Sequence, residues 1–310
     1  MGQWTNIDPH LLLYVFLPPL IFGEAMSLNY YNAKGALSQA LVMAGPGVVI
    51  GATLLGAIAK YMLHYNWSWN LAMIFGSIMA CTDPVAVVAL LKSAGASPKL
   101  TIIIVGESLL NDGTAMVMFN IFNNCFNGQT YTIAQIVSYF FSACLGAAVF
   151  GAVMGYCAIR WLRRTNRPLS QVDVLVQIAI TLCCAYTTFF VAENTFGISG
   201  VLACVGAGAV ICWLGPPIIL NHETMHHVWG MIEWSLNTML FMHAGLIIGN
   251  RVFDAVIPID WFYLFAFYVI MMAVRSFVLL VLYPFISRYG HKCTVNEAIF
   301  MSWGGLRGVS

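Results

Sequence analysis

The sequence predicts an all-α, polytopic membrane protein, built as a helical bundle of about ten spans. Of its 310 residues, 60% are hydrophobic and only 8% are charged, and the mean hydropathy is +0.83. A soluble domain carries about 25% charged residues, so this composition excludes a soluble protein. The formal net charge is +1 and no basic run is present, so nothing supports a nucleic-acid partner. We therefore expect the lipid bilayer to surround the chain.

Apolar runs of helical length, separated by short polar segments, divide the chain into these spans. In chain order they lie at about 11–26, 37–63, 70–91, 100–123, 133–161, 172–192, 197–214, 229–249, 261–287 and 295–310. Pro18 and Pro19 predict that the first span is bent or broken, because proline cannot donate the backbone hydrogen bond of a helix. We expect all the spans to form a single transmembrane domain over residues 1–310.

The orientation of the chain follows from the positive charges in its loops. Loops after even-numbered spans hold only Lys60 and Arg251. Loops after odd-numbered spans hold Lys34, Lys92, Lys99, Arg160, Arg163, Arg164, Arg167, Arg288 and Lys292. Cytoplasmic loops carry the excess of Lys and Arg, so the odd-numbered loops are predicted to face the cytoplasm.

The third span carries an acidic residue at a helix-breaking position. Asp83 lies in the run Thr82-Asp83-Pro84 between two apolar segments. Pro84 biases the residues before it away from helix, and a break at membrane depth leaves backbone carbonyls that only protein or water can satisfy. Broken helices with an ion site at the break are typical of transporters. The alternative is a structural carboxylate pair in a channel or a membrane enzyme.

The fourth span holds a second group of polar residues, Glu107, Ser108, Asn111 and Asp112. Helical spacing places Ser108 and Asp112 one turn apart on one face. Na⁺ is a hard cation that prefers oxygen ligands, which Asp112, Ser108, Thr82 and freed carbonyls of the broken span could supply. Dehydration disfavours the charged form of a carboxylate, so Asp112 must hold either a proton or a cation. Competition between a proton and Na⁺ for this one carboxylate predicts that the protein is an exchanger.

Other features of the sequence suggest competing roles. His222, Glu223 and His226 match the pattern H-E-x-x-H, so an integral-membrane zinc protease is one alternative, and an amphipathic connecting helix is another.

Arg275 lies about mid-span, which favours an internal salt bridge over snorkelling towards the membrane surface. The nine cysteines form no Cys-x-x-Cys pair and are expected to pack as small apolar residues.

Several runs resemble the monovalent cation/proton antiporter family in its sodium/proton exchanger branch. These runs are FLPPLIF, CTDPVAVVALL, GESLLNDGTA, ISGVLA, LNTMLF and WGGLRG, and the plant salt-tolerance and sperm-type exchangers share two of them. The resemblance implies inverted repeats with crossed discontinuous helices, and electroneutral exchange of Na⁺ (or Li⁺ or K⁺) for H⁺ by alternating access. It also implies a multi-pass protein of the plasma membrane, a homodimer in the full-length parent, no enzyme activity, no cofactor and no metal beyond the transported cation.

The resemblance also assigns roles to individual residues. Asp112 matches the ion and proton carrier, and Ser108 is similar to a family ion ligand. Glu107 looks like the partner of a buried arginine that matches Arg275. Asn111, where other branches have a second aspartate, resembles the branch with electroneutral exchange.

Two further stretches of the chain are interpreted through the same resemblance. Thr82-Asp83-Pro84 matches the first crossing helix, and Arg307 lies where the second one begins. The family commonly reads Leu-Pro-Pro-Leu-Leu-Phe-Glu, but here Gly23 follows Phe22. Glu24 comes one residue later and is turned by about 100° on a helix, which makes it a weak ion ligand. We also expect further spans before the first one and after Ser310; a truncated remnant that does not transport is the remaining alternative.

Overall fold

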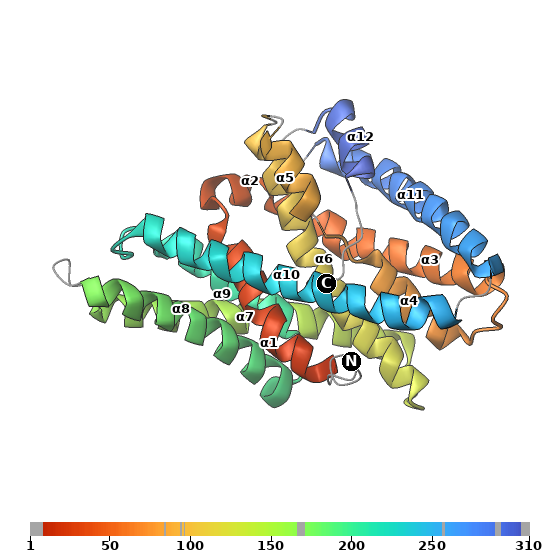
Figure 1. Ribbon diagram of the computed structural model, residues 1–310, viewed down its shortest axis with the longest axis horizontal. Coiled ribbons are helices and arrows are strands. Elements are labelled where there is room, and N and C mark those ends of the chain that lie inside the picture. Colours follow the sequence, from red (N-terminus) through yellow and green to blue (C-terminus); the bar gives the residue numbers. More distant parts are fainter. Residues whose placement is uncertain are drawn as a thin grey trace. The chain divides into compact units, whose positions relative to one another are not determined.

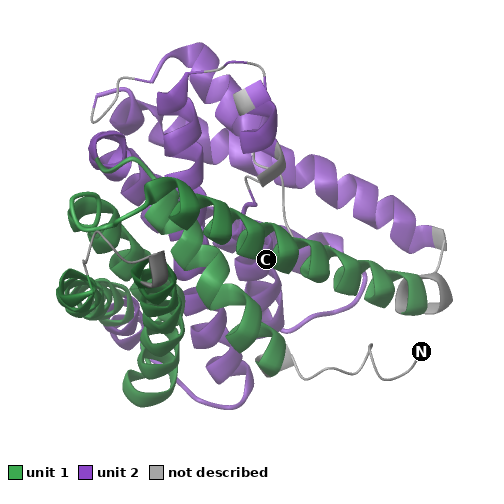
Figure 2. Ribbon diagram, turned by 60° about the vertical axis from the view of Figure 1, so that its left-hand side comes forward, with its two compact units in different colours: residues 1–30, 141–253 green, residues 31–140, 254–310 purple. Residues whose placement is uncertain are grey.

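The computed structural model describes residues 9–83, 85–93, 95, 97–165, 171–255, 258–288 and 293–304, and these residues form helices and connecting turns without a strand (Figure 1). The chain divides into two compact units (Figure 2). Unit 1 comprises Met1–Tyr30 and Phe141–Phe253, and unit 2 comprises Tyr31–Phe140 and Asp254–Ser310.

The helices of each unit come from two separate stretches of sequence. Unit 1 holds α1 (Pro9–Ser27), most of α7 (Ile133–Arg164), α8 (Gln171–Val191), the π-helical turn η3 (Ala192–Phe196), α9 (Gly200–Leu214) and most of α10 (His222–Ala255). Unit 2 holds most of α2 (Tyr30–Val42), the π-helical turn η2 (Met43–Gly47), α3 (Val48–Met62), α4 (Trp69–Ala80), α5 (Val85–Ser93), α6 (Pro98–Phe126), α11 (Pro258–Ile286) and α12 (Val295–Trp303).

The apolar helices match the predicted spans in position. Within the described residues, six helices are long and apolar enough to cross a membrane: Tyr30–Met62, Pro98–Phe126, Ile133–Arg164, Asp173–Phe196, His222–Asn250 and Ile259–Ile286. Shorter apolar helices at Leu11–Ser27, Trp69–Ala80 and Gly200–Leu214 fall in the predicted first, third and seventh spans. The prediction of an all-α, multi-pass membrane protein is therefore confirmed.

The first span was expected to be bent or broken, and the structure shows that it is not broken. α1 continues as one helix through Pro18 and Pro19. Pro19 has no N–H to donate to the carbonyl of Val15, four residues earlier. The Tyr186 hydroxyl of α8 donates to that oxygen instead, at 2.9 Å. A neighbouring helix thus satisfies the acceptor that Pro19 leaves without a helical donor.

Small residues let α3 and α4 approach closely in unit 2. A Cβ atom built on Gly76 of α4 would overlap the carbonyl oxygen of Ala52, and one built on Gly56 of α3 would lie 2.9 Å from the carbonyl oxygen of Ala72. Such small residues at matching positions are typical of packed membrane helices. The close packing fixes α4 along its length and thereby positions the residues that follow its last turn.

Candidate cation site

The helix of the third predicted span is interrupted where its sequence contains proline. α4 ends at Ala80 and α5 begins at Val85. Cys81 leaves the helix with φ −57° and ψ 143°, and its N–H reaches the Ile78 carbonyl at 3.3 Å. Pro84 itself lies outside the described residues. The break leaves the backbone of Thr82 without helical partners, so other groups must satisfy it.

Two side chains of α6 satisfy Thr82. The Ser108 hydroxyl donates to the Thr82 carbonyl oxygen, and the Asn111 side-chain N–H donates to the Thr82 hydroxyl oxygen at 3.2 Å. All three residues are buried, with exposed fractions of 3–4%. The two hydrogen bonds fasten the break to α6, and they use residues that the sequence singled out.

A second irregular segment contacts the same helix, and sequence reasoning missed it. Pro46 lies in the π-helical turn η2, where the N–H of Val48 bonds to carbonyls other than that of Ala44. The Thr114 hydroxyl of α6 donates to the Ala44 oxygen at 2.8 Å. The one available signal was the proline within the second predicted span, because proline removes a helical donor.

Two carboxylates lie beside the break. Asp83 and Asp112 are half-buried and close enough to interact electrostatically. The Cys81 thiol donates a hydrogen bond to Asp112, a contact that the expectation of purely apolar cysteines missed. Asp112 Oδ1 is buried and has no hydrogen-bond partner among the described residues. A dehydrated carboxylate oxygen with a free lone pair is suited to a proton or a cation.

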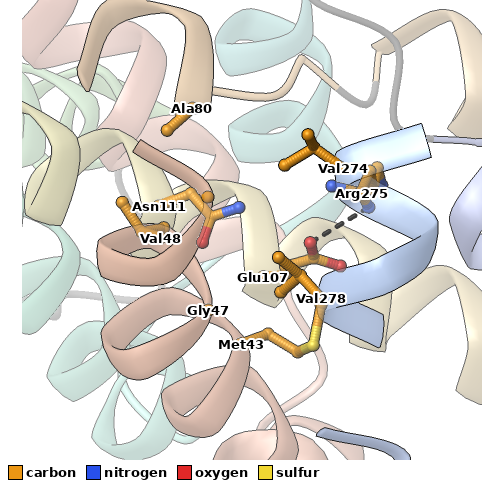
Figure 3. A pocket seen from close by; sticks show the side chains of 10 residues that line it. Met43, Gly47, Val48, Ala80, Glu107, Asn111, Val274, Arg275 and Val278 are labelled. Carbon is orange, nitrogen blue, oxygen red and sulfur yellow. Dashed lines mark ion pairs between the residues drawn. The ribbon is translucent and has the colours of Figure 1, made fainter. Parts of the chain in front are cut away.

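Glu107 and Arg275 form a buried ion pair in the same unit. Arg275 Nη2 lies 3.0 Å from Glu107 Oε1, and the two side chains are 9% and 2% exposed (Figure 3). Arg275 Nε also donates to the Met301 carbonyl of α12, at 3.1 Å. The second hydrogen bond helps to offset the cost of burying the guanidinium group.

A small cavity of about 30 Å³ adjoins this ion pair, and Asn111 also lines it (Figure 3). Glu107 Oε2 and Asn111 Oδ1 have no hydrogen-bond partner among the described residues. A cavity of this volume holds about one water molecule, which could donate a hydrogen bond to each of the two oxygens.

The structure thus brings together most of the candidate residues. Thr82, Asp83, Ser108, Asn111 and Asp112 gather around the break of unit 2. Their side chains carry carboxylate, hydroxyl and amide oxygens, which are the types of ligand that hard cations prefer. Arg307 lies outside the described residues, so its place in a second crossing helix stays a prediction. Glu24 belongs to unit 1.

The H-E-x-x-H pattern does not build a metal centre in the described residues. His222 and His226 are exposed at the start of α10, and His222 Nε2 lies 2.9 Å from the Pro216 carbonyl oxygen. Glu223 Oε1 lies 3.8 Å from His227 Nε2, and the His227 and Glu223 side chains are 80% and 86% exposed. No group of three His, Cys, Asp or Glu side chains is placed to hold a metal in the described part of the chain. The protease alternative has no support.

Comparison with known proteins decides the family. The sequence profile of the family described as "Sodium/hydrogen exchanger, transmembrane" matches residues 2–310. The chain belongs to the sodium/hydrogen exchanger family. It is 36% identical to sodium/hydrogen exchanger 7 and 35% identical to sodium/hydrogen exchanger 8 of Arabidopsis thaliana, each over 98% of this chain. The chain spans 27% and 40% of the lengths of these two relatives.

A bacterial relative and an archaeal solved structure extend the comparison. The chain is 30% identical to the Na⁺/H⁺ antiporter NhaP of Pseudomonas aeruginosa, over 96% of this chain and 70% of that protein. The solved structure of the sodium proton antiporter MjNhaP1 from Methanocaldococcus jannaschii matches with a TM-score of 0.72. That match has 16% identity and covers 95% of this chain and 69% of the other, so it shows a shared fold.

Proposed function

We propose that this protein is a secondary antiporter that exchanges one Na⁺ for one H⁺ across a membrane by alternating access. Relatives named as Na⁺/H⁺ exchangers and antiporters support the cargo, with Li⁺ and K⁺ as competing cations. In this proposal the protein is a transporter without cofactor rather than an enzyme. Units 1 and 2 are parts of one transmembrane domain, in a homodimer of the plasma membrane.

The observation that carries the proposal is the buried carboxylate oxygen of Asp112 beside the broken helix. Asp112 Oδ1 lacks a hydrogen-bond partner among the described residues, and the Asp83 carboxylate lies near enough to add negative charge. An uncompensated negative charge at membrane depth is costly, so the site favours the arrival of a positive cargo. Either a proton or Na⁺ removes the same charge from Asp112, and the two therefore exclude each other.

The remaining residues have supporting roles in this proposal. The Ser108 hydroxyl donates a hydrogen bond to the Thr82 carbonyl, which leaves the lone pairs of its own oxygen for a cation. The Asn111 side-chain N–H donates a hydrogen bond to Thr82, and its amide oxygen has no hydrogen-bond partner among the described residues. This oxygen is neutral, so Asn111 adds a cation ligand to the site without adding a second negative charge. That neutrality supports a one-for-one exchange. Glu107 and Arg275 neutralise one another and hold α6 against α11.

The test is transport in sealed vesicles by the protein expressed from its whole reading frame. An imposed Na⁺ gradient should drive a pH change. With the same K⁺ concentration inside and outside the vesicles in both arms, adding valinomycin to clamp the membrane potential should leave the initial rate unchanged. Asp112→Asn, which keeps the size and removes the charge, should abolish the pH change while the protein still inserts. Glu223→Gln, which neutralises an exposed carboxylate, is the matched control and should exchange like the parent. Exchange by Asp112→Asn near the parent rate would contradict the carrier assignment.

A further inference from the structure

Gly23 of α1 leaves a space that a carboxylate from another helix fills. Gly23 is buried, and it stands where the family motif commonly has glutamate. A Cβ atom built at this position would overlap Oε1 of Glu233, and it would lie 3.1 Å from the Glu233 carboxyl carbon. It would also lie 3.0 Å from Cε3 of Trp229. The head of the Glu233 side chain of α10 therefore occupies the place of a side chain at position 23.

Trp229 positions Glu233 against Gly23. The two residues are four apart in α10 and so share one face of the helix. The Trp229 ring packs on Phe22 with centroids 5.4 Å apart, and its indole N–H donates to the Thr181 hydroxyl of α8 at 3.2 Å. Trp229 and Phe22 are 2% and 0% exposed. These buried contacts hold the turn of α10 that carries Trp229 against α1 and α8, one turn before Glu233.

The position of Glu233 in the chain gives this contact a meaning beyond packing. Glu233 lies within the candidate membrane span His222–Asn250. A carboxylate inside such a span is costly, and it usually marks an ion path or the site of a charged partner. Glu24, the nearest acidic residue in α1, is turned by about 100° from position 23. Glu24 therefore cannot present its carboxylate in the same direction from the helix.

We propose that Glu233 of α10 supplies the carboxylate that the family motif places at position 23 of α1. In this arrangement it is a binding group of unit 1 for the transported monovalent cation, and the loss of the side chain at Gly23 makes room for it. The inference rests on the proposed exchange function. It adds Glu233 as a cation-binding residue, which lies outside both the motif of α1 and the broken helix. A purely structural role for the same carboxylate is the outcome that the test must separate.

The test moves the carboxylate between the two helices and measures the apparent KM for Na⁺ in vesicles. Glu233→Gln keeps the size but removes the charge, and should raise this KM about tenfold or more with the folded amount unchanged. Gly23→Glu alone should lose exchange, because its side chain meets the Glu233 carboxylate. The double variant Gly23→Glu/Glu233→Ala restores one carboxylate at the same place and should recover a KM within about threefold of the parent. Glu223→Gln, on the exposed start of the same helix, is the control for α10.

Two readouts separate this inference from the proposed exchange. When the parent exchanges and Asp112→Asn does not, a parent-like KM in Glu233→Gln overturns the role of Glu233 and leaves the exchange function standing. If the parent does not exchange, the exchange proposal fails. The role of Glu233 is then tested in detergent, by comparing how much added Na⁺ raises the melting temperature of the parent and of Glu233→Gln. A rise that is present in the parent and lost in Glu233→Gln supports the inference. A rise that is equal in both, or absent from the parent, overturns it.

Discussion

Arg275 of α11 binds two other helices of unit 2: its Nη2 lies 3.0 Å from Glu107 Oε1 on α6, and its Nε donates to the Met301 carbonyl of α12 at 3.1 Å. One guanidinium group thereby ties the helix that carries Asp112 to α12. Both charged side chains are buried, so each depends on the other for compensation. The pair is therefore expected to matter for stability more than an exposed ion pair would.

The first prediction concerns the loss of either charge. Glu107→Ala or Arg275→Ala leaves an uncompensated buried charge and should lower the free energy of unfolding by about 3–5 kcal/mol. The folded fraction in detergent, followed by fluorescence-detected size exclusion after heating, measures the change. The double variant should cost less than the sum of the single variants, because the second change removes the stranded charge. If both single variants melt like the parent, the ion pair does not stabilise the fold.

The second prediction concerns Ser108. Ser108→Ala leaves the Thr82 carbonyl at the break without its donor, which should destabilise the protein by about 1–3 kcal/mol and raise the apparent KM for Na⁺. Melting in detergent and vesicle transport measure the two effects. Ser93→Ala is the matched control, since the exposed Ser93 hydroxyl also donates to a backbone carbonyl, that of Leu90 at 2.8 Å. Equal melting temperatures for the two variants would show that the Ser108 hydrogen bond does not hold the break.

The third prediction concerns the continuous helix α1. Tyr186→Phe removes the donor to the Val15 carbonyl, which Pro19 cannot replace, and should lower stability by about 1–3 kcal/mol. Tyr14→Phe is the control, because the Tyr14 hydroxyl donates to the exposed Asn194 side chain, at 3.3 Å. Melting curves of the two variants compare the losses. A change as small for Tyr186→Phe as for Tyr14→Phe would mean that the proline-rich turn satisfies its carbonyl in another way.

The sequence predicted the local features of the fold and of the site. Apolar run lengths located the helices, and Pro84 located the break at Thr82 and Asp83, because both signals depend on neighbouring residues alone. Helical spacing put Ser108 and Asp112 on one face. The ionic roles of these residues stay predictions until transport is measured.

The features that the sequence did not predict depend on contacts between distant segments. Local pattern gives no sign that Thr114 reaches Ala44, that Tyr186 reaches Val15, or that Glu233 fills the space at Gly23. In each case one helix has an irregularity, such as a proline or a missing side chain, and another helix compensates for it. Only the packing of the helices reveals which residue does so. The same packing shows that Pro18 and Pro19 do not break α1.

The last prediction follows from one carboxylate that serves two cargoes. A protonated Asp112 carries no charge and offers a poorer oxygen ligand, so H⁺ and Na⁺ compete for it. Lowering the pH on the side of Na⁺ entry should therefore raise the apparent KM for Na⁺ and leave the maximal rate unchanged. By mass action, the rise should approach about tenfold per pH unit where the carboxylate is mostly protonated. Initial rates of ²²Na⁺ uptake over a series of pH values and Na⁺ concentrations measure this. A maximal rate that falls with pH at constant KM would mean that protons act on a group other than the cation-binding carboxylate, and Asp112 would then not be the shared carrier.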